Sequence, residues 1–222
     1  MTDENPKGAL QGRRAAGQDA SKRRQILEGA RQVFSAQGFD AASMNDITQA
    51  AGVSKGTIYV YFQSKEQLFV ALIAEERERM AAELFEAIED EPDVAQALAL
   101  FGRRLVRLLT RDHVLRAQRI VLGVAERMPD LGREFFEAGP MRTRARLEAY
   151  FDRHVAAGRL VIGDTALAAS QFIELSAGWL LRQRLYGAVR EAPTDAETAR
   201  HVDGAVALFM SAYRSADSPA AR

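Results

Sequence analysis

The chain has 222 residues with balanced charge, 30 basic against 30 acidic side chains, and 47% hydrophobic residues, a composition typical of globular proteins. It contains no cysteine and only three histidines, which excludes disulfide and cysteine-nucleophile chemistry and argues against a metal site. The first 20 residues are polar and no apolar run is long enough to span a bilayer, so we expect a cytoplasmic protein without membrane contact.

The neutral total hides a basic N-terminal part. Residues 5–65 hold nine basic and four acidic side chains, so the rest of the chain carries a net negative charge. A basic end on a neutral protein favours a polyanionic partner at that end. Within it, residues 1–20 lack hydrophobic periodicity and are expected to form a disordered basic arm, which either meets DNA or serves only as a solubilising tail.

Helical periodicity dominates the remaining chain and predicts an all-α fold of about nine helices. Capping boxes at Ser43–Asp46, Ser64–Gln67 and Thr194–Glu197 open three of them. A further segment is interrupted at Gly139–Pro140. The predicted segments cover about residues 21–37, 43–51, 54–62, 64–88, 98–109, 115–124, 129–158, 164–186 and 194–214.

Residues 43–62 have the pattern of a helix-turn-helix. Ile47 and Ile58 anchor its two helices inward, and Gly52 supplies the positive φ that the tight turn needs. The helical wheel then turns the following residues of the second helix outward: Gly56, Thr57, Tyr59 and Val60, flanked by Lys55 and Tyr61. A glycine, hydroxyls and a lysine on one face suit a DNA major groove. Two short helices of any all-α domain, with tyrosines as core residues, are the alternative.

Residues 21–72 resemble the DNA-binding domain of the TetR/AcrR family of bacterial repressors. The resemblance rests on Gly38–Ile47, on Val53-Ser-Lys-Gly-Thr-Ile-Tyr59 and on Phe62-Gln-Ser-Lys-Glu-Gln-Leu68. The C-terminal part looks like the AefR-like subgroup, through the segments Arg119–Glu126, Pro129–Leu131, Phe136–Pro140 and Ala157–Leu160.

The resemblance implies two domains. An N-terminal three-helix domain, residues 21–66, would bind operator DNA. A C-terminal helical domain, residues 67–214, would dimerise and bind a small molecule whose binding releases the DNA. Residues 215–222 are expected to be a disordered tail.

Carried onto this sequence, the resemblance implies DNA contacts from Ser43, Asn45, Lys55, Gly56, Thr57, Tyr59, Tyr61 and Lys65. Lys65 would meet a phosphate at the start of its helix, where the helix dipole also favours an anion. A solvated Lys65 and a Tyr61 packed against the first helix of the motif are the alternatives. A homodimer would place its two recognition helices on an inverted repeat of double-stranded DNA.

Two hydrophobic stripes near the C-terminus are candidates for the dimer interface. The family's four-helix interface implies contacts from Phe172, Leu175, Trp179, Val206, Phe209 and Tyr213. Periodicity fits an intramolecular core equally well, so the dimer depends on the resemblance.

A ligand cavity would need an apolar lining between helices. The candidate lining residues are Phe101, Leu105, Leu109, Ile120, Phe135, Phe136, Met141 and Phe172, each of which could instead be plain core. Because the sequence holds no carboxylate-rich cluster, we expect a lipophilic, neutral or weakly anionic effector.

These features predict a homodimeric, ligand-responsive transcriptional repressor with no catalytic residues, metal or other cofactor. A DNA-binding regulator of the same fold without a small-molecule ligand is the first alternative. An all-α enzyme is the second, and against it the sequence lacks a glycine-rich phosphate loop and a Gly-x-Ser-x-Gly elbow.

Overall fold

The computed structural model describes residues 6–89 and 91–215, with side chains for all of them except 6–18, 75–83 and 87. The chain divides into two compact units, Met1–Leu72 and Ile73–Arg222. They are called the first and the second unit.

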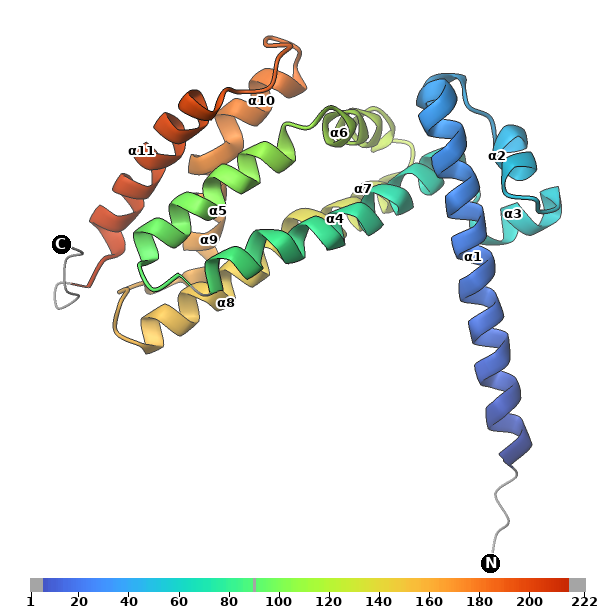
Figure 1. Ribbon diagram of the computed structural model, residues 1–222, viewed down its shortest axis with the longest axis horizontal. Helices are drawn as coiled ribbons and strands as arrows, with labels where there is room; N and C mark the ends of the chain where they lie inside the picture. Colours follow the sequence, from blue (N-terminus) through green and yellow to red (C-terminus); the bar gives the residue numbers. More distant parts are fainter. Residues whose placement is uncertain (1–5, 90, 216–222) are drawn as a thin grey trace, which may run out of the picture. The chain divides into compact units, whose positions relative to one another are not determined.

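The described residues are almost entirely helical (Figure 1). The elements are α1 (Pro6–Ala41), α2 (Met44–Ala50), α3 (Lys55–Tyr61), α4 (Lys65–Glu89), α5 (Val94–Leu109), α6 (Asp112–Val124), α7 (Pro129–Phe136), the π-helical turn η1 (Glu137–Met141), α8 (Arg142–Ala156), α9 (Thr165–Ile173), the π-helical turn η2 (Glu174–Gly178), α10 (Trp179–Leu185) and α11 (Asp195–Tyr213). Since η1 joins α7 to α8 and η2 joins α9 to α10, they form nine continuous segments. The described ranges contain no strand, only an isolated bridge between Leu160 and Arg214, and the all-α prediction is confirmed.

The first helix begins earlier than the sequence predicts. It starts at Pro6, whereas the polar composition predicts a disordered arm over residues 1–20 and a helix from about residue 21. Residues 7–20 include four Ala, two Arg and two Gln, which favour a helix even without an apolar face and outnumber the three Gly that disfavour it, and a proline is tolerated in the first turn. Residues 1–5 of the expected arm and 216–222 of the expected tail lie outside the described residues. At its other end, Gly38 interrupts α1 at the predicted position, with a φ of 78°.

The core of the first unit joins the apolar faces of α1 to α4. Its buried members are Ile26, Leu27, Ala30, Val33, Ala42, Ile47, Ile58, Phe62, Leu68 and Leu72. The backbones of α1 and the turn after α2 approach closely at Gly29, where an added Cβ would lie 2.6 Å from the backbone nitrogen of Ala51. Gln25 of α1 strengthens this contact by donating a 2.7 Å hydrogen bond to the carbonyl of Ala51.

The second unit has a larger core in which α5 packs against α11 and η2, while α8 packs on α9. Its aromatic centre joins Phe101, Phe172 and Phe209, with ring centroids 6.2 Å apart for the first two and 5.2 Å apart for the last two. Pro140 lies inside η1, at the predicted interruption. Proline has no backbone N–H to donate, and the π-helical turn accommodates the missing hydrogen bond. Among the described helices, none is both long and apolar enough to cross a membrane.

A buried polar pair lies on α8 of the second unit. The rings of Tyr150 and His154 are 4.2 Å apart, and neither the Tyr150 hydroxyl nor His154 Nδ1 has a hydrogen-bond partner among the described residues. Burial, together with the positive charges of Arg159 and Arg153, lowers the pKa of His154 from 6.5 to about 4. Burial also raises the pKa of Tyr150 to about 12, so both side chains are neutral at pH 7.

The low pKa of His154 predicts a loss of stability in mild acid. Because the unfolded histidine takes up its proton near pH 6.5 and the folded one only near pH 4, the free energy of unfolding falls as the pH falls between these values. We expect a loss of about 1–2 kcal/mol, allowing for screening by nearby solvent. Denaturant unfolding between pH 7 and 4.5 should show this loss in the wild type and in the control His201→Gln. The same pH slope in His154→Phe would contradict the assignment.

Candidate nucleic-acid interface

The first helix of the motif, α2, is fixed by the predicted capping box. Asp46 N donates to Ser43 Oγ over 3.2 Å, and the Asp46 carboxylate accepts from Ser43 N at 3.0 Å and from Ser43 Oγ at 2.6 Å. The hydrogen bonds from the Ser43 hydroxyl and amide lower the pKa of Asp46. The Ser43 side chain is therefore used within the chain, while Asn45 of the same turn is exposed.

The second helix of the motif, α3, turns a mixed face toward solvent. Ser54 caps it by accepting from Thr57 N at 3.1 Å, and the Ser54 and Thr57 hydroxyls lie 2.7 Å apart. Ile58 is fully buried and holds the helix on the core. The exposed residues of α3 are Lys55, Gly56, Tyr59 and Val60.

Gly56 lies on this exposed face with open space in front of it. A Cβ added there would meet nothing nearer than Ser54 Oγ at 3.9 Å among the described residues. Glycine inside a helix costs about 0.5–1 kcal/mol relative to alanine, and neither packing nor a left-handed backbone requires one here. A missing side chain at this point matters only to a molecule that approaches the helix from outside.

The Lys65 ammonium is used differently from the expected phosphate contact. Its Nζ donates three hydrogen bonds of 3.0 Å, to the carbonyl oxygens of Phe39, Asp40 and Ala42. It also lies 4.7 Å from the centre of the Phe39 ring. An ammonium has three protons, and all three are directed at the carbonyls that follow the end of the regular part of α1. In this geometry Lys65 clasps α1 to α4 and offers no donor to a phosphate; we call this contact the Lys65 clasp.

Tyr61 is also tied to α1. Its ring is half-buried against the first core, and its hydroxyl hydrogen-bonds the Asp19 carboxylate, which raises the pKa of Tyr61. This position fits the packing alternative better than a freely exposed DNA contact. The sequence holds no signal for this bond, because Asp19 lies in the segment without hydrophobic periodicity.

Three of the residues expected at a dimer interface lie inside the second unit. Phe172, Val206 and Phe209 are buried in the core of the second unit, because their stripes face α5 and α8 of the same chain. Trp179 is 59% exposed and Leu175 is also exposed. Tyr213 is half-buried, and its hydroxyl donates to Gln171 Oε1 at 3.3 Å.

The opposite faces of the same helices expose apolar side chains that the periodicity did not single out. Leu208 of α11 is 63% exposed, and Leu167 of α9 is exposed as well. On α11 this face continues through Gly204, Ala207 and Ser211, at helical spacing of three and four residues. The sequence contains the helical spacing of this face, but its small residues give a weaker hydrophobic stripe than the aromatic residues that face the core.

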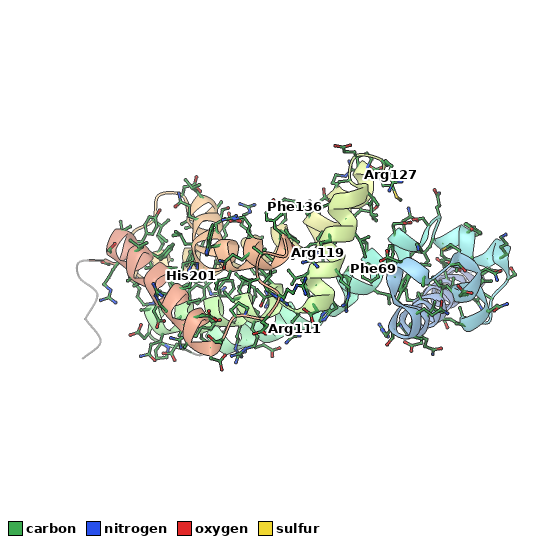
Figure 2. All side chains as sticks on the ribbon, turned by 90° about the horizontal axis from the view of Figure 1, so that it is seen from above. Phe69, Arg111, Arg119, Arg127, Phe136 and His201 are labelled. Carbon is green, nitrogen blue, oxygen red and sulfur yellow. The ribbon has the colours of Figure 1, made fainter. Side chains whose placement is uncertain are left out.

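The eight residues expected to line a ligand site do not share one environment. Phe101, Leu105 and Phe172 are buried in the second core, and Leu109 packs against it. Ile120 and Phe135 are half-buried, whereas Met141 and Phe136 are exposed; Phe136 is labelled in Figure 2. The burial of Phe101, Leu105 and Phe172 fits both the plain-core alternative and a place in the lining of a ligand site.

Arginines tie α6 to α10 within the second unit. Arg119 of α6, labelled in Figure 2, donates to the carbonyls of Arg184 at 2.6 Å and Leu185 at 2.9 Å. The buried Arg184 in turn donates to the Asp112 carboxylate at 2.6 Å and to the Thr110 carbonyl at 3.3 Å. These bonds hold α6 at Asp112 and at Arg119, and α6 is the helix on which the AefR-like resemblance begins.

Comparison with known proteins gives two family matches. Residues 26–72 match the bacterial regulatory proteins of the tetR family, and residues 96–215 match the C-terminal domain of AefR-like transcriptional repressors. The HTH-type transcriptional repressor AcnR of Corynebacterium glutamicum is 30% identical over 183 residues, which cover 74% of this chain and 95% of AcnR. The first curated relatives match over only 34% to 50% of their own length.

Two solved structures share the fold along most of the chain. A TetR-family transcriptional regulator of Mesorhizobium loti superposes with a TM-score of 0.76 at 28% identity, over 88% of this chain and 98% of its own. The flavonoid-responsive regulator FrrA gives a TM-score of 0.69 at 32% identity, over 91% of this chain and 100% of its own.

Proposed function

The chain belongs to the TetR family of bacterial DNA-binding transcriptional repressors, and from this premise we propose that it acts in the cytoplasm as a homodimer on an inverted-repeat operator. Each subunit would insert α3 into the major groove of one half-site. A small molecule bound by the second unit would release the DNA. The relatives are transcriptional regulators, and we propose no enzymatic reaction for this chain.

The main observation in support of the proposed DNA-binding surface is the open position at Gly56. Its exposed backbone lets α3 approach a groove more closely than any side chain would allow. Lys55 and Tyr59 flank Gly56 and supply an ammonium and a hydroxyl that suit base edges or phosphates. Thr57 directly follows Gly56 in the first turn of α3. Asn45, exposed at the start of α2, would add a contact at the groove edge.

Gly56→Ala should make the protein more stable and a weaker DNA binder at once. Alanine favours the helix, so the free energy of unfolding should rise by up to about 1 kcal/mol. The added methyl holds α3 away from the DNA, and we expect at least about a tenfold loss of operator affinity. Thermal unfolding and gel-shift titration of DNA from upstream of the gene measure the two effects.

Gly123→Ala is the matched control, because Gly123 is also helical and an added Cβ there has no described neighbour within 4 Å. It should gain stability without losing affinity. Equal affinity of Gly56→Ala and wild type would contradict the proposed surface. The same titrations, followed by light scattering, should give two chains per bound duplex.

The exposed apolar face of α9 to α11 supports the proposed dimer. Trp179, Leu175 and Leu208 lie on two helical segments that pack together within the chain, and an isologous contact with a second copy would remove them from water. This face replaces Phe172, Val206 and Phe209 as the proposed interface.

The effector we propose is a lipophilic, weakly acidic phenolic compound of the flavonoid class. The support comes from FrrA, whose name describes a flavonoid-responsive regulator and which matches along its whole length. Flavonoids added to the operator complex should release the DNA. If none of them binds, the regulator of the same fold without a ligand is favoured.

A further inference from the structure

The most exposed apolar side chain of α3 is Val60, with 80% of its surface open to solvent. It lies one helical turn after Gly56 on the same face and beside Tyr59. It takes no part in the first core, which Ile58 joins from the same helix. Since β-branched residues are also mediocre helix formers, neither packing nor helix stability accounts for a valine at this position.

The neighbourhood of Val60 is otherwise polar. Lys55 and Tyr59 supply the donors that base edges and phosphates require, whereas valine offers only two methyl groups. A contact of Val60 with a phosphate or a base acceptor would therefore gain nothing. Its chemistry fits only an apolar feature of the DNA.

The major groove of DNA presents one such feature, the C5-methyl group of thymine. A short side chain reaches it only where the helix backbone lies close to the groove floor, and the open position at Gly56 permits that approach one turn away. We propose that Val60 is a specificity-determining residue that reads a thymine in each half-site through its C5-methyl group. The proposal rests on the proposed insertion of α3 into operator DNA.

The test removes the methyl group from the DNA. Once the operator has been defined by footprinting, each thymine of the half-site is replaced in turn by deoxyuridine, which differs only in lacking this methyl. One position should weaken wild-type binding about fourfold in a single half-site and about 15-fold when both half-sites are changed, the effect of losing one buried methyl each. The other positions should have no effect.

Val60→Ala gives the matching change in the protein. It shortens an exposed side chain on a helix, so the fold is kept, and it should weaken binding to the thymine operator while abolishing the effect of deoxyuridine. Leu122→Ala, a change at another exposed apolar side chain on α6, is the control and should keep the wild-type response.

The outcomes separate this inference from the proposed function. An operator that binds tightly but contains no thymine sensitive to deoxyuridine would overturn the role of Val60 and leave the repressor intact. An equal response in Val60→Ala and wild type would do the same. Failure to bind any duplex specifically would overturn the proposed function and the inference with it.

Discussion

Gly29→Ala is expected to lower the free energy of unfolding of the first unit by about 3 kcal/mol, at the top of the usual range for overpacking. The new methyl would lie 2.6 to 2.7 Å from the backbone nitrogen, Cα and Cβ of Ala51. Backbone atoms cannot turn aside as a flexible side chain does, so α2 must move away from α1. Denaturant unfolding followed by circular dichroism measures the loss.

The displacement should also reach DNA binding. Ala51 directly precedes the turn at Gly52, so a shift of α2 changes the angle between α2 and α3. We expect operator affinity of the folded variant to fall together with its stability. Gly123→Ala serves as the control, because the same change there meets no described atom within 4 Å. A Gly29→Ala protein as stable as this control would show that α1 and α2 do not approach so closely.

Lys65→Met should destabilise the first unit by about 3 kcal/mol, because it leaves three backbone carbonyls without the ammonium that they share. Methionine keeps the length and the apolar contact with the Phe39 ring, so the loss reports the hydrogen bonds and the charge. Thermal unfolding gives the stability. Operator affinity should also fall, since the clasp holds the end of α1 just before α2.

Two further measurements distinguish a clasp from a phosphate contact. The salt dependence of operator binding should keep its slope in Lys65→Met, whereas each lost phosphate contact would flatten it by about 0.9. Lys65→Arg should fail to restore stability, because a planar guanidinium does not direct three donors at carbonyls arranged around a tetrahedral ammonium. Lys55→Met is the control that should leave stability unchanged. A flattened slope with normal stability in Lys65→Met would restore the phosphate contact.

The parts of the fold that the sequence predicts well depend on neighbouring residues. The capping boxes at Ser43 and Thr194 form because both partners lie within one turn of helix. Gly52 adopts the positive φ that a tight turn requires, and Pro140 produces the predicted interruption as a π-helical turn. Each of these follows from local chemistry and needs no knowledge of the tertiary fold.

The expectations that the structure does not support depend on residues far apart in the chain. Both faces of α11 carry apolar residues, and only the packing of α5 decides that Val206 faces inward and Leu208 outward. Lys65 reaches carbonyls 23 to 26 residues away, at a position that the end of α1 takes only in the folded unit. The start of α1 was missed for another reason, since a polar helix without an apolar stripe shows no periodicity.

The Lys65 clasp also has a consequence for the chemical reactivity of the protein. The chain has four lysines. Lys55 begins α3 of the helix-turn-helix motif, and Lys65 begins α4, the helix that follows it. An acylating reagent must reach the side-chain nitrogen, and Lys65 Nζ is directed at three carbonyl oxygens, whereas Lys55 is exposed. Acetylation would therefore act on Lys55 before Lys65. It would remove one positive charge from α3 and leave the joint between α1 and α4 intact.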